Sequence, residues 1–466
     1  MRFDIVEHKR ELLVELVEAD NDNVVFYNRC LEVKPRTFIN RGKAISYYKI
    51  HFSGNRIELE ADYYIGADWI IPSEKFVYVA PKINTKLIEK FEEEINKEEK
   101  INGNNTEPID YRPEELNYLK MFLDAAAHPE VLKHTKGLLF IDWEAPEIQL
   151  TQEEKDLLTP FLVVQYLNLL KQLVRKGLKK SYYKVTHNLQ SKVKGKILVG
   201  QNIKTNIFKN RLTNTICEYQ EFGIDTMENR FLKKVLKFVS TYIANNQKLF
   251  SGNENELMQM IGYCNPAFEN VSNEYNEDEL RHVKANPFFK EYKEAIKIGK
   301  LILKRFAYNI SNAAQSEIVT TPPFWIDMPR LFELYVYHLL LKENSNKTSN
   351  ISYQFSTYGN YLDFLIRDGA NSMVVDAKYK LQYENGKVHN DMRQVAGYAR
   401  LTKVRNEVSK ENNNFSKETV LPCLIVYPSI KLDDSTSFKL SDLIDENRAI
   451  KAYHKIYKLG ISLPVI

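Results

Sequence analysis

A hydrophobic run at residues 372–375 leads directly into two opposite charges, Asp376 and Lys378, with Ala377 between them. A further carboxylate, Asp363, lies earlier in the same stretch, YLDFLIRDGANSMVVDAKYK. Successive side chains of a strand alternate between its two faces, so Asp376 and Lys378 are expected to point the same way. If the strand that carries Asp363 pairs beside this one, two carboxylates and a main-chain carbonyl meet at one spot.

These residue types define a chemistry. Two carboxylates and the carbonyl of Ala377 supply the hard oxygen ligands that Mg²⁺ prefers, so we predict a metal site at Asp363, Asp376 and Ala377, with Mn²⁺ as a substitute. The metal would neutralise a phosphodiester and acidify a bound water, while Lys378 would orient that water or help to deprotonate it. The predicted reaction is hydrolysis of a phosphate ester. The alternative is a structural salt bridge between Asp376 and Lys378.

Three further polar residues are candidates for supporting catalytic roles. Glu333, in LFELYV, precedes the predicted sheet on a helix and could hydrogen-bond metal-bound waters. Gln394 and Tyr398 are four residues apart and therefore share one face of a later helix, and Asp391 lies one turn earlier on nearly the same face. The alternatives are a solvated helix position for Glu333 and core packing for Tyr398.

The elements that must position these residues form one α/β unit from Asp327 onward. We expect, in chain order, a helix at 328–342, strands at 351–356, 361–367 and 373–380, a helix at 390–403 and a strand at 421–429.

The segment before this unit divides into two further regions. Short β-type runs at 24–33, 44–52, 55–61 and 75–83 predict a small β domain. A charged helical stretch at 86–100 and a polar loop at 102–108 then indicate a linker. Beyond them, apolar periodicity predicts helices at 157–180 and 227–244.

The predicted fold class is therefore an α+β multidomain chain with a small N-terminal β domain, a largely helical middle region and a C-terminal α/β domain. The predicted domains are 1–110, which is β-rich and docks a partner, 111–315, which is mostly helical and carries a basic patch, and 316–466.

The basic patch holds nine Lys or Arg residues without a single Asp or Glu, and Tyr182 and Tyr183 lie among them. Such a surface could grip DNA phosphates independently of sequence. The alternatives are a solvated helix end with its loop and a docking surface for an acidic partner. The nine candidates for DNA binding are Lys171, Arg175, Lys176, Lys179, Lys180, Lys184, Lys192, Lys194 and Lys196.

Composition excludes several other classes. A formal charge of +4 over 466 residues argues against wholesale coating of nucleic acid. The four cysteines form no CxxC pair, which argues against a disulfide framework or a zinc site. No stretch approaches the ~20 apolar residues of a membrane span, so we expect a soluble cytoplasmic protein. The absence of GxxxxGK[ST] predicts no P-loop hydrolysis, and neither His338 nor His389 has a convincing catalytic partner.

The spacing of Asp363, Asp376, Lys378, Gln394 and Tyr398 resembles the PD-(D/E)XK nuclease core. The wording DAKYK followed by DMRQVAGYA resembles specifically the McrC family, the nuclease subunits of McrBC-type modification-dependent restriction systems. Upstream, YYIGADWIIPSEKFVYVAPKI resembles that family's N-terminal stretch, and RKGLKKSYY, VKGKI and DTMENRFLKKVL resemble its middle portion. The chain departs from the nominal motif at Leu362, where the motif has proline, a residue that contributes backbone shape rather than chemistry.

This resemblance implies a PD-(D/E)XK restriction-endonuclease-like domain at 316–466, with Asp363 and Asp376 as metal ligands and Lys378 as the catalytic lysine. It implies an Mg²⁺-dependent endonuclease subunit for antiviral defence that cleaves double-stranded DNA, methylated or not. A separate McrB-like AAA+ GTPase hexamer would drive it, and the chain would stimulate that partner's hydrolysis. The alternatives are a stand-alone nuclease of the same core and a non-catalytic activator of a partner NTPase.

Overall fold

The structure is a computed structural model, and it describes residues 2–6, 10–15, 21–33, 35, 37–40, 43–81, 116–151, 158–247, 250, 254–275, 290–311, 318–379, 388–411, 415–416, 418–429, 437–450 and 453–465. The charged stretch at 86–100, the loop at 102–108 and both predicted domain boundaries lie outside these residues, so the three-domain division stays a prediction. The chain forms two compact units, one of Met1–Thr151 with Ile318–Ile466 and one of Gln152–Glu317.

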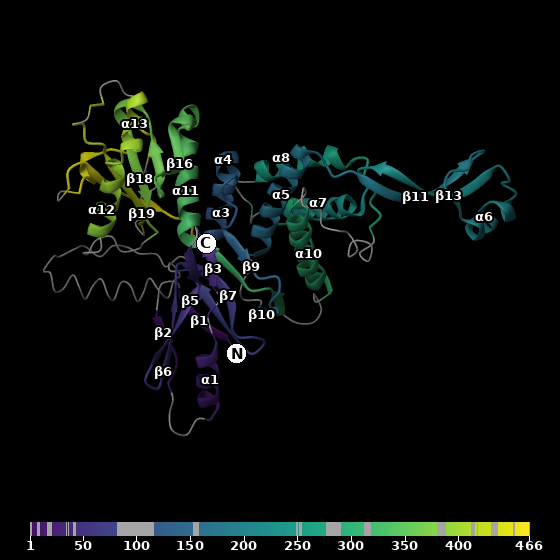
Figure 1. The fold of residues 1–466 in the computed structure, drawn as a ribbon, viewed down its shortest axis with the longest axis horizontal. Helices are drawn as coiled ribbons and strands as arrows, with labels where there is room; N and C mark the ends of the chain where they lie inside the picture. The colour runs from purple at the N-terminus through teal and green to yellow at the C-terminus, as the bar shows by residue number, and fades with distance from the viewer. Residues whose placement is uncertain are drawn as a thin grey trace. The chain divides into compact units, whose positions relative to one another are not determined.

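The N-terminal part of the first unit is built on a five-stranded sheet in the order β1-β8-β7-β15-β9 (Figure 1). Strand β1 pairs in parallel with β8, and the other neighbours are antiparallel. Strand β7 is buried along its whole length, as expected for a central strand with both faces covered. The strands are β1 Arg2–Val6, β7 Tyr64–Ile71, β8 Lys75–Ala80, β9 Leu139–Ile141 and β15 Phe324–Asp327.

Smaller sheets and three short helices complete this part. The sheets have the orders β2-β6-β5, β3-β4 and β10-β14, and all their pairs are antiparallel. Their strands are β2 Arg10–Glu15, β3 Thr37–Asn40, β4 Lys43–Ser46, β5 Tyr48–Ser53, β6 Arg56–Ala61, β10 Ile148–Thr151 and β14 Ile318–Thr321. The helices are α1 Asn21–Glu32, α3 Tyr118–Ala127 and α4 Pro129–Leu132.

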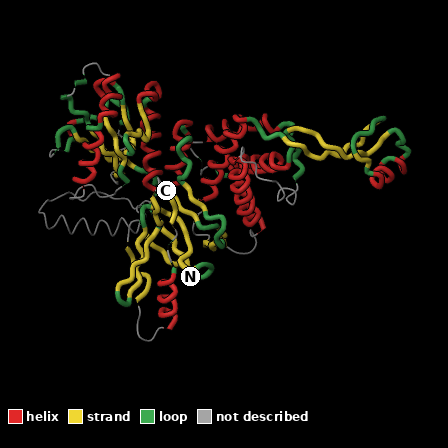
Figure 2. The backbone as a smooth tube through the Cα atoms, viewed as in Figure 1, coloured by secondary structure: helices red, strands yellow, loops and turns green. Residues whose placement is uncertain are grey.

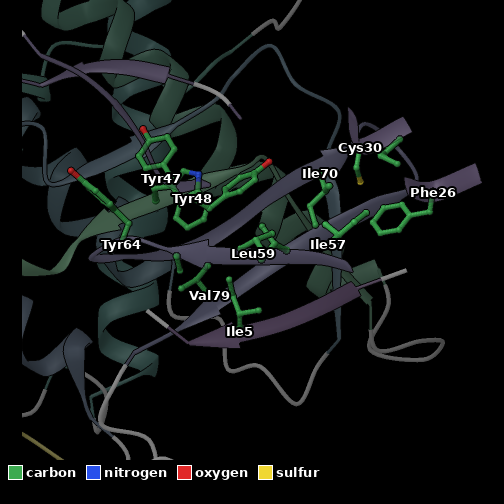
Figure 3. Close-up of a cluster of buried hydrophobic side chains, with 14 residues drawn as sticks. Ile5, Phe26, Cys30, Tyr47, Tyr48, Ile57, Leu59, Tyr64, Ile70 and Val79 are labelled. Atoms are coloured by element: carbon green, nitrogen blue, oxygen red, sulfur yellow. The ribbon is translucent and has the colours of Figure 1, made fainter. Parts of the chain in front are cut away.

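One prediction for this region is wrong. The run at 24–33 was expected to be a strand because it is rich in β-branched and aromatic residues, but it lies in helix α1. The helix places Phe26 and Cys30, four residues apart, on one face, where both are buried. They pack with Ile57, Ile70 and their neighbours in one apolar cluster, so tertiary packing overrides local propensity here (Figure 3).

The C-terminal part of the first unit is a five-stranded sheet in the order β16-β17-β18-β19-β20. Figure 2 draws its strands in yellow among red helices at the upper left. The pairs β16/β17 and β17/β18 are antiparallel, whereas β18/β19 and β19/β20 are parallel. The strands are β16 Ile351–Thr357, β17 Asn360–Ile366, β18 Met373–Ala377, β19 Cys423–Ser429 and β20 Ile456–Ser462. The first four agree with the predicted strands, and β20 was not predicted.

Helices cover both faces of this sheet. The Tyr337 ring of α11 stacks on Tyr353, whereas Met392 and Val395 of α12 pack against Leu365. The predicted helix at 328–342 is confirmed, and the one predicted at 390–403 is two helices, since the chain turns at residues 400–401. The helices are α11 Met328–Glu343, α12 Val388–Ala399 and α13 Thr402–Glu411, with 3-10 turns η4 Ser345–Asn350, η5 Gly369–Asn371 and η6 Glu446–Arg448.

The second unit combines a helical body with a long β arm. Helix α10 packs against α5 and α7, and α5 also packs against α8. Strands β11 and β13 form a long antiparallel ribbon that runs away from these helices and carries α6 at its far end (Figure 1). The two-residue strand β12 pairs with β13 on its other side, which gives a three-stranded sheet in the order β11-β13-β12. The elements are α5 Leu158–Lys176, β11 Ser181–Gln190, β12 Lys196–Ile197, α6 Val199–Thr205, η1 Ile207–Lys209, β13 Asn214–Gly223, α7 Met227–Asn245, α8 Glu254–Cys264, η2 Asn265–Phe268 and α10 Lys290–Ser311.

The helices at 157–180 and 227–244 were predicted, and α5 and α7 confirm them. The β arm was not predicted. Within the described part of the chain, no helix has both the length and the apolar character needed to cross a membrane.

Candidate active site

The candidate site forms where two neighbouring strands separate. The ladder between β17 and β18 ends at the pair Phe364 and Val375. Beyond it, the side chain of Asp363 takes over the role of a backbone partner, because its Oδ2 accepts a hydrogen bond from the Ala377 N–H at 2.8 Å. The N–H and C=O of one strand residue point to the same side, so the Ala377 carbonyl also faces the gap that the separation opens.

Asp376 lies at the end of β18 and is only 2% exposed. Its Oδ2 lies 2.8 Å from Lys378 Nζ, an ion pair between two side chains on the same face of the strand. Among the described residues this buried oxygen has no hydrogen-bond partner of suitable geometry. Burying this oxygen is costly even with the ammonium of Lys378 beside it, and its position at the end of β18 makes it a candidate ligand for a metal ion.

The two carboxyl groups influence each other's protonation. Burial, followed by the charges of Glu333 and Asp376, raises the pKa of Asp363 well above its ordinary value, although the Ala377 N–H and Lys378 oppose the shift. Burial also raises the pKa of Asp376, and the negative charge of Asp391 adds to it, while Lys378 lowers it. Crowded carboxyl groups of this kind favour binding of a cation that offsets their negative charge.

Lys378 connects the carboxylates to helix α12. Burial alone would lower its pKa, but Asp376 and the other nearby carboxylates outweigh burial and raise it, so the side chain is held as an ammonium. Its Nζ also donates a hydrogen bond to Gln394 Oε1 at 3.1 Å. Gln394 Nε2 in turn donates to the Tyr398 hydroxyl at 2.7 Å, as expected for two residues one helical turn apart.

Glu333 approaches the site from helix α11 on the other face of the sheet. Its Oε2 accepts hydrogen bonds from the Tyr353 hydroxyl at 3.1 Å and from Gln354 Nε2 at 2.9 Å. Burial, followed by the charge of Glu333, raises the pKa of Tyr353, so its hydroxyl remains a donor at neutral pH. The negative charge of Glu333 contributes to the raised pKa of Asp363.

These residues fit a small, hard cation. Within the described ranges, no three His, Cys, Asp or Glu side chains come together as a full set of metal ligands. Mg²⁺ does not need such a set, because it is commonly held by one or two carboxylates together with waters and substrate phosphates. The buried oxygen of Asp376, the carboxyl group of Asp363 and the Ala377 carbonyl match that pattern.

The structure thus brings together all six predicted catalytic residues around the separation of β17 and β18. Sequence reasoning missed Tyr353 and Gln354, the two residues that hydrogen-bond Glu333. No local sequence pattern marks these two residues as part of a site. The pairing of β16 with β17 places them beside the strand that carries Asp363. His338 is not part of the site, and the side chain of His389 lies outside the described residues.

The predicted basic set is spread over several elements rather than one helix end. Lys179 is not available to bind DNA at the surface, because its Nζ forms an ion pair with the buried Glu228 at 2.5 Å. Lys176 forms an ion pair with Glu291. The exposed members on the arm are Lys184, Lys192, Lys194 and Lys196.

The end of the arm also exposes large apolar side chains, which the sequence analysis did not single out. Phe208 and Leu212 are 77% and 76% exposed, and the same segment exposes Val199, Ile203 and Ile207. Exposed apolar groups that gather in one place mark binding surfaces more often than isolated ones do. The other exposed apolar residues of the arm are Tyr182, Val193, Ile197 and Phe222.

Comparison with known proteins identifies one matching family. A family model described as McrBC 5-methylcytosine restriction system component matches residues 61–408, which is more than half of the chain. No curated protein matches the sequence.

Two solved assemblies from Thermococcus gammatolerans are similar at low identity. One is described as a refined half-complex from a tetradecameric assembly of McrB AAA+ hexamers with bound McrC; the match has 16% identity, covers 99% of this chain and 94% of the other, and has a TM-score of 0.35. The other is described as the McrBC complex, with 13% identity, 74% and 88% coverage and a TM-score of 0.26. At TM-scores of this size, neither structure indicates how this chain folds or what it binds.

Proposed function

The chain belongs to the family of McrBC 5-methylcytosine restriction system components, and from that membership we propose that it is the Mg²⁺-dependent DNA endonuclease subunit of a cytoplasmic McrBC-like restriction complex. It would cleave phosphodiester bonds of double-stranded DNA, methylated or not, through a PD-(D/E)XK core. The observation that carries the proposal is the convergence of Asp363, Asp376 and Lys378 where β17 and β18 separate.

Each residue of the site has a distinct task in this reaction. Asp363, Asp376 and the carbonyl of Ala377 would hold Mg²⁺. When bound, Mg²⁺ would neutralise the phosphodiester and lower the pKa of a water molecule. Lys378 is held as an ammonium, so it would donate to the attacking water or to the charge that develops on the phosphate. Gln394 would keep that ammonium in place through its Oε1.

Glu333 and Tyr398 would act around this centre. Glu333 lies close enough to raise the pKa of Asp363, and its carboxylate would accept hydrogen bonds from waters on the metal. Tyr398 would fix the orientation of the Gln394 amide, because its hydroxyl accepts from Nε2 and leaves Oε1 to face Lys378.

We further propose that a separate McrB-like AAA+ GTPase hexamer drives cleavage and that this chain stimulates its hydrolysis. The arm supports contact with a protein, since phosphate binding alone would not require the exposed apolar groups around Phe208 and Leu212. The exposed lysines of the arm would add attraction to an acidic surface or to DNA phosphates.

The deciding experiment measures cleavage by the chain together with its partner. The tagged protein is captured from its native cells with a slowly hydrolysed GTP analogue, and the co-purified GTPase is combined with the wild type, Asp376→Ala or Lys378→Ala. We expect Mg²⁺- and GTP-dependent cutting of DNA by the wild type, with loss of cutting in both variants and unchanged stimulation of GTP hydrolysis.

Two outcomes would refute parts of this proposal. Normal cleavage by either variant would show that the site assignment is wrong. Cleavage by the isolated chain with Mg²⁺ alone would instead show a stand-alone nuclease that needs no motor.

A further inference from the structure

Gln354 has a backbone conformation that its side chain does not favour. Its φ is +53°, in the left-handed region, where a residue other than glycine is uncommon. It lies in the interior of β16, so no turn requires this conformation. Such a conformation is unfavourable for a residue with a side chain, and it persists only where the surroundings impose it.

The unusual conformation interrupts the pairing of β16 with β17 opposite Asp363. The ladder joins Tyr353 to Phe364 and Phe355 to Leu362, and the pair between them, Gln354 with Asp363, is missing. The metal-ligand candidate on β17 and the strained residue on β16 therefore face each other across one break in the sheet.

The break also moves side chains from one face of the sheet to the other. Residues two apart on a strand normally share a face. Tyr353 nevertheless stacks on Tyr337 of α11, while Phe355 packs into the cluster under α12. The change of face occurs at Gln354.

A direct result is that two consecutive residues reach the same atom. In a regular strand, Tyr353 and Gln354 would point to opposite faces. Here the Tyr353 hydroxyl and Gln354 Nε2 both donate to Glu333 Oε2, at 3.1 and 2.9 Å. With one oxygen of Glu333 held by two donors, the orientation of the whole carboxylate is fixed.

We propose that Gln354 is a positioning residue for the metal site, and that its left-handed backbone serves to turn its amide onto Glu333 beside Asp363. This inference rests on the proposed function. Glu333 is thereby presented to metal-bound water in one orientation, and Tyr353 acts with Gln354 on the same oxygen. Partners that orient groups around a metal typically contribute 10–100-fold to metal affinity or activity.

The test is a titration of the full-length, DNA-free protein with Mn²⁺, followed by electron paramagnetic resonance and paired with thermal unfolding of the metal-free protein. Gln354→Gly accepts the left-handed backbone but lacks the amide. We expect its Mn²⁺ affinity to fall about tenfold, because loss of a residue that orients a group around a metal typically reduces metal affinity by this much. The Tm of the metal-free protein should not decrease. Tyr353→Phe, which lacks only the hydroxyl, should also weaken Mn²⁺ binding.

The matched control is Tyr358→Gly. Tyr358 also has a positive φ, +47°, in the turn between β16 and β17, but it is 81% exposed. This variant should keep the wild-type Mn²⁺ affinity. A double-mutant cycle adds the decisive readout: in a Glu333→Gln background, Gln354→Gly should cause no further loss, because the carboxylate that it positions is gone.

The outcomes separate this inference from the proposed function. Wild-type Mn²⁺ binding that Asp376→Ala abolishes, together with unchanged affinity in Gln354→Gly, would overturn the positioning role alone. Equal losses from Gln354→Gly in the wild-type and Glu333→Gln backgrounds would do the same. Absence of any Mn²⁺ binding by the wild type that depends on Asp376 would overturn the metal site and the inference together.

Discussion

Gln394 Oε1 accepts a hydrogen bond from Lys378 Nζ at 3.1 Å, which ties helix α12 to the end of strand β18. The ammonium of Lys378 is thus held between the Asp376 carboxylate on its own strand and an amide on a separate helix. A flexible lysine in this setting has one preferred position, and that position lies beside the two carboxyl groups.

Replacing Gln394 should therefore lower catalysis without removing the metal. We expect Gln394→Ala to decrease kcat for DNA cleavage about 10–100-fold, because Lys378 loses a fixed partner. Tyr398→Phe should have a smaller effect, since it removes only the hydrogen bond from Gln394 Nε2 and leaves the one between Lys378 and Gln394 Oε1. Single-turnover cleavage and Mn²⁺ titration would check this, and a large loss of Mn²⁺ affinity in Gln394→Ala would contradict it.

Asp376→Asn should make the metal-free protein more stable while it stops cleavage. Burial raises the pKa of Asp376, which shows that its charge is unfavourable in the folded protein, so a neutral isostere should raise the free energy of unfolding. Loss of a carboxylate ligand should reduce cleavage at least ~100-fold. Thermal unfolding without metal and a cleavage assay would measure the two effects.

Asp368→Asn is the matched control for that variant. Burial opposes ionisation of Asp368, but hydrogen bonds from Lys347 and Asn371 outweigh it and lower the pKa of this carboxyl group. Its charge is therefore favourable in the folded protein, and Asp368→Asn should lower stability. If both variants shifted Tm in the same direction, the distinction between the two carboxylates would be wrong.

Stability should fall on acidification because of His338 in helix α11. Burial lowers the pKa of His338 from 6.5 to about 4, and its Nδ1 is a buried nitrogen with no hydrogen-bond partner among the described residues. Between these two values the unfolded chain binds more protons than the folded one, so the free energy of unfolding falls as pH falls from 6.5 towards 4. We expect a contribution of about 1–2 kcal/mol, allowing for partial exposure.

Denaturant unfolding between pH 4 and pH 7 would measure this contribution. His338→Leu should flatten the acid side of the profile, whereas His454→Gln, at an exposed position, should leave it unchanged. An acid limb that stays the same in His338→Leu would assign the pH dependence to other groups.

The arm should bind a partner through its apolar end. We expect Phe208→Ser with Leu212→Ser to weaken the complex with the GTPase at least ~10-fold, since a few large anchor residues carry most of the binding energy of an interface. Tm should change little, because both side chains are exposed. Met258→Ser, on an exposed position of α8, is the control. Sedimentation or calorimetric titration would measure binding, and unchanged affinity would exclude this surface.

Much of the candidate site was predictable from sequence because its signals are local. The apolar run before Asp376, the acid on the preceding strand and the four-residue spacing of Gln394 and Tyr398 each follow from strand or helix periodicity. The same periodicity predicted α11 and the strands β16 to β19.

The parts that sequence did not reveal depend on contacts between distant segments. Strand β20 reads as an ordinary apolar stretch until it pairs in parallel with β19. The β arm lacks the buried face that would give β11 a clear alternating pattern, because most of its side chains are exposed. Gln354 carries no sign of a positive φ, since glutamine has no special preference for it, and its hydrogen bond to Glu333 of α11 forms only when distant segments come together.

Strand β15 ends at Asp327 and helix α11 begins at Met328, so the N-terminal sheet passes into the helix of Glu333 without a linker. The junction is stiff, because Asp327 accepts from the Arg330 N–H at 3.0 Å and donates its own N–H to the Leu138 carbonyl. A displacement of the sheet would therefore be transmitted directly to helix α11 and to Glu333, which that helix carries. Cutting the chain before β15 would leave this strand without its two partners, β7 and β9, and so expose both of its edges.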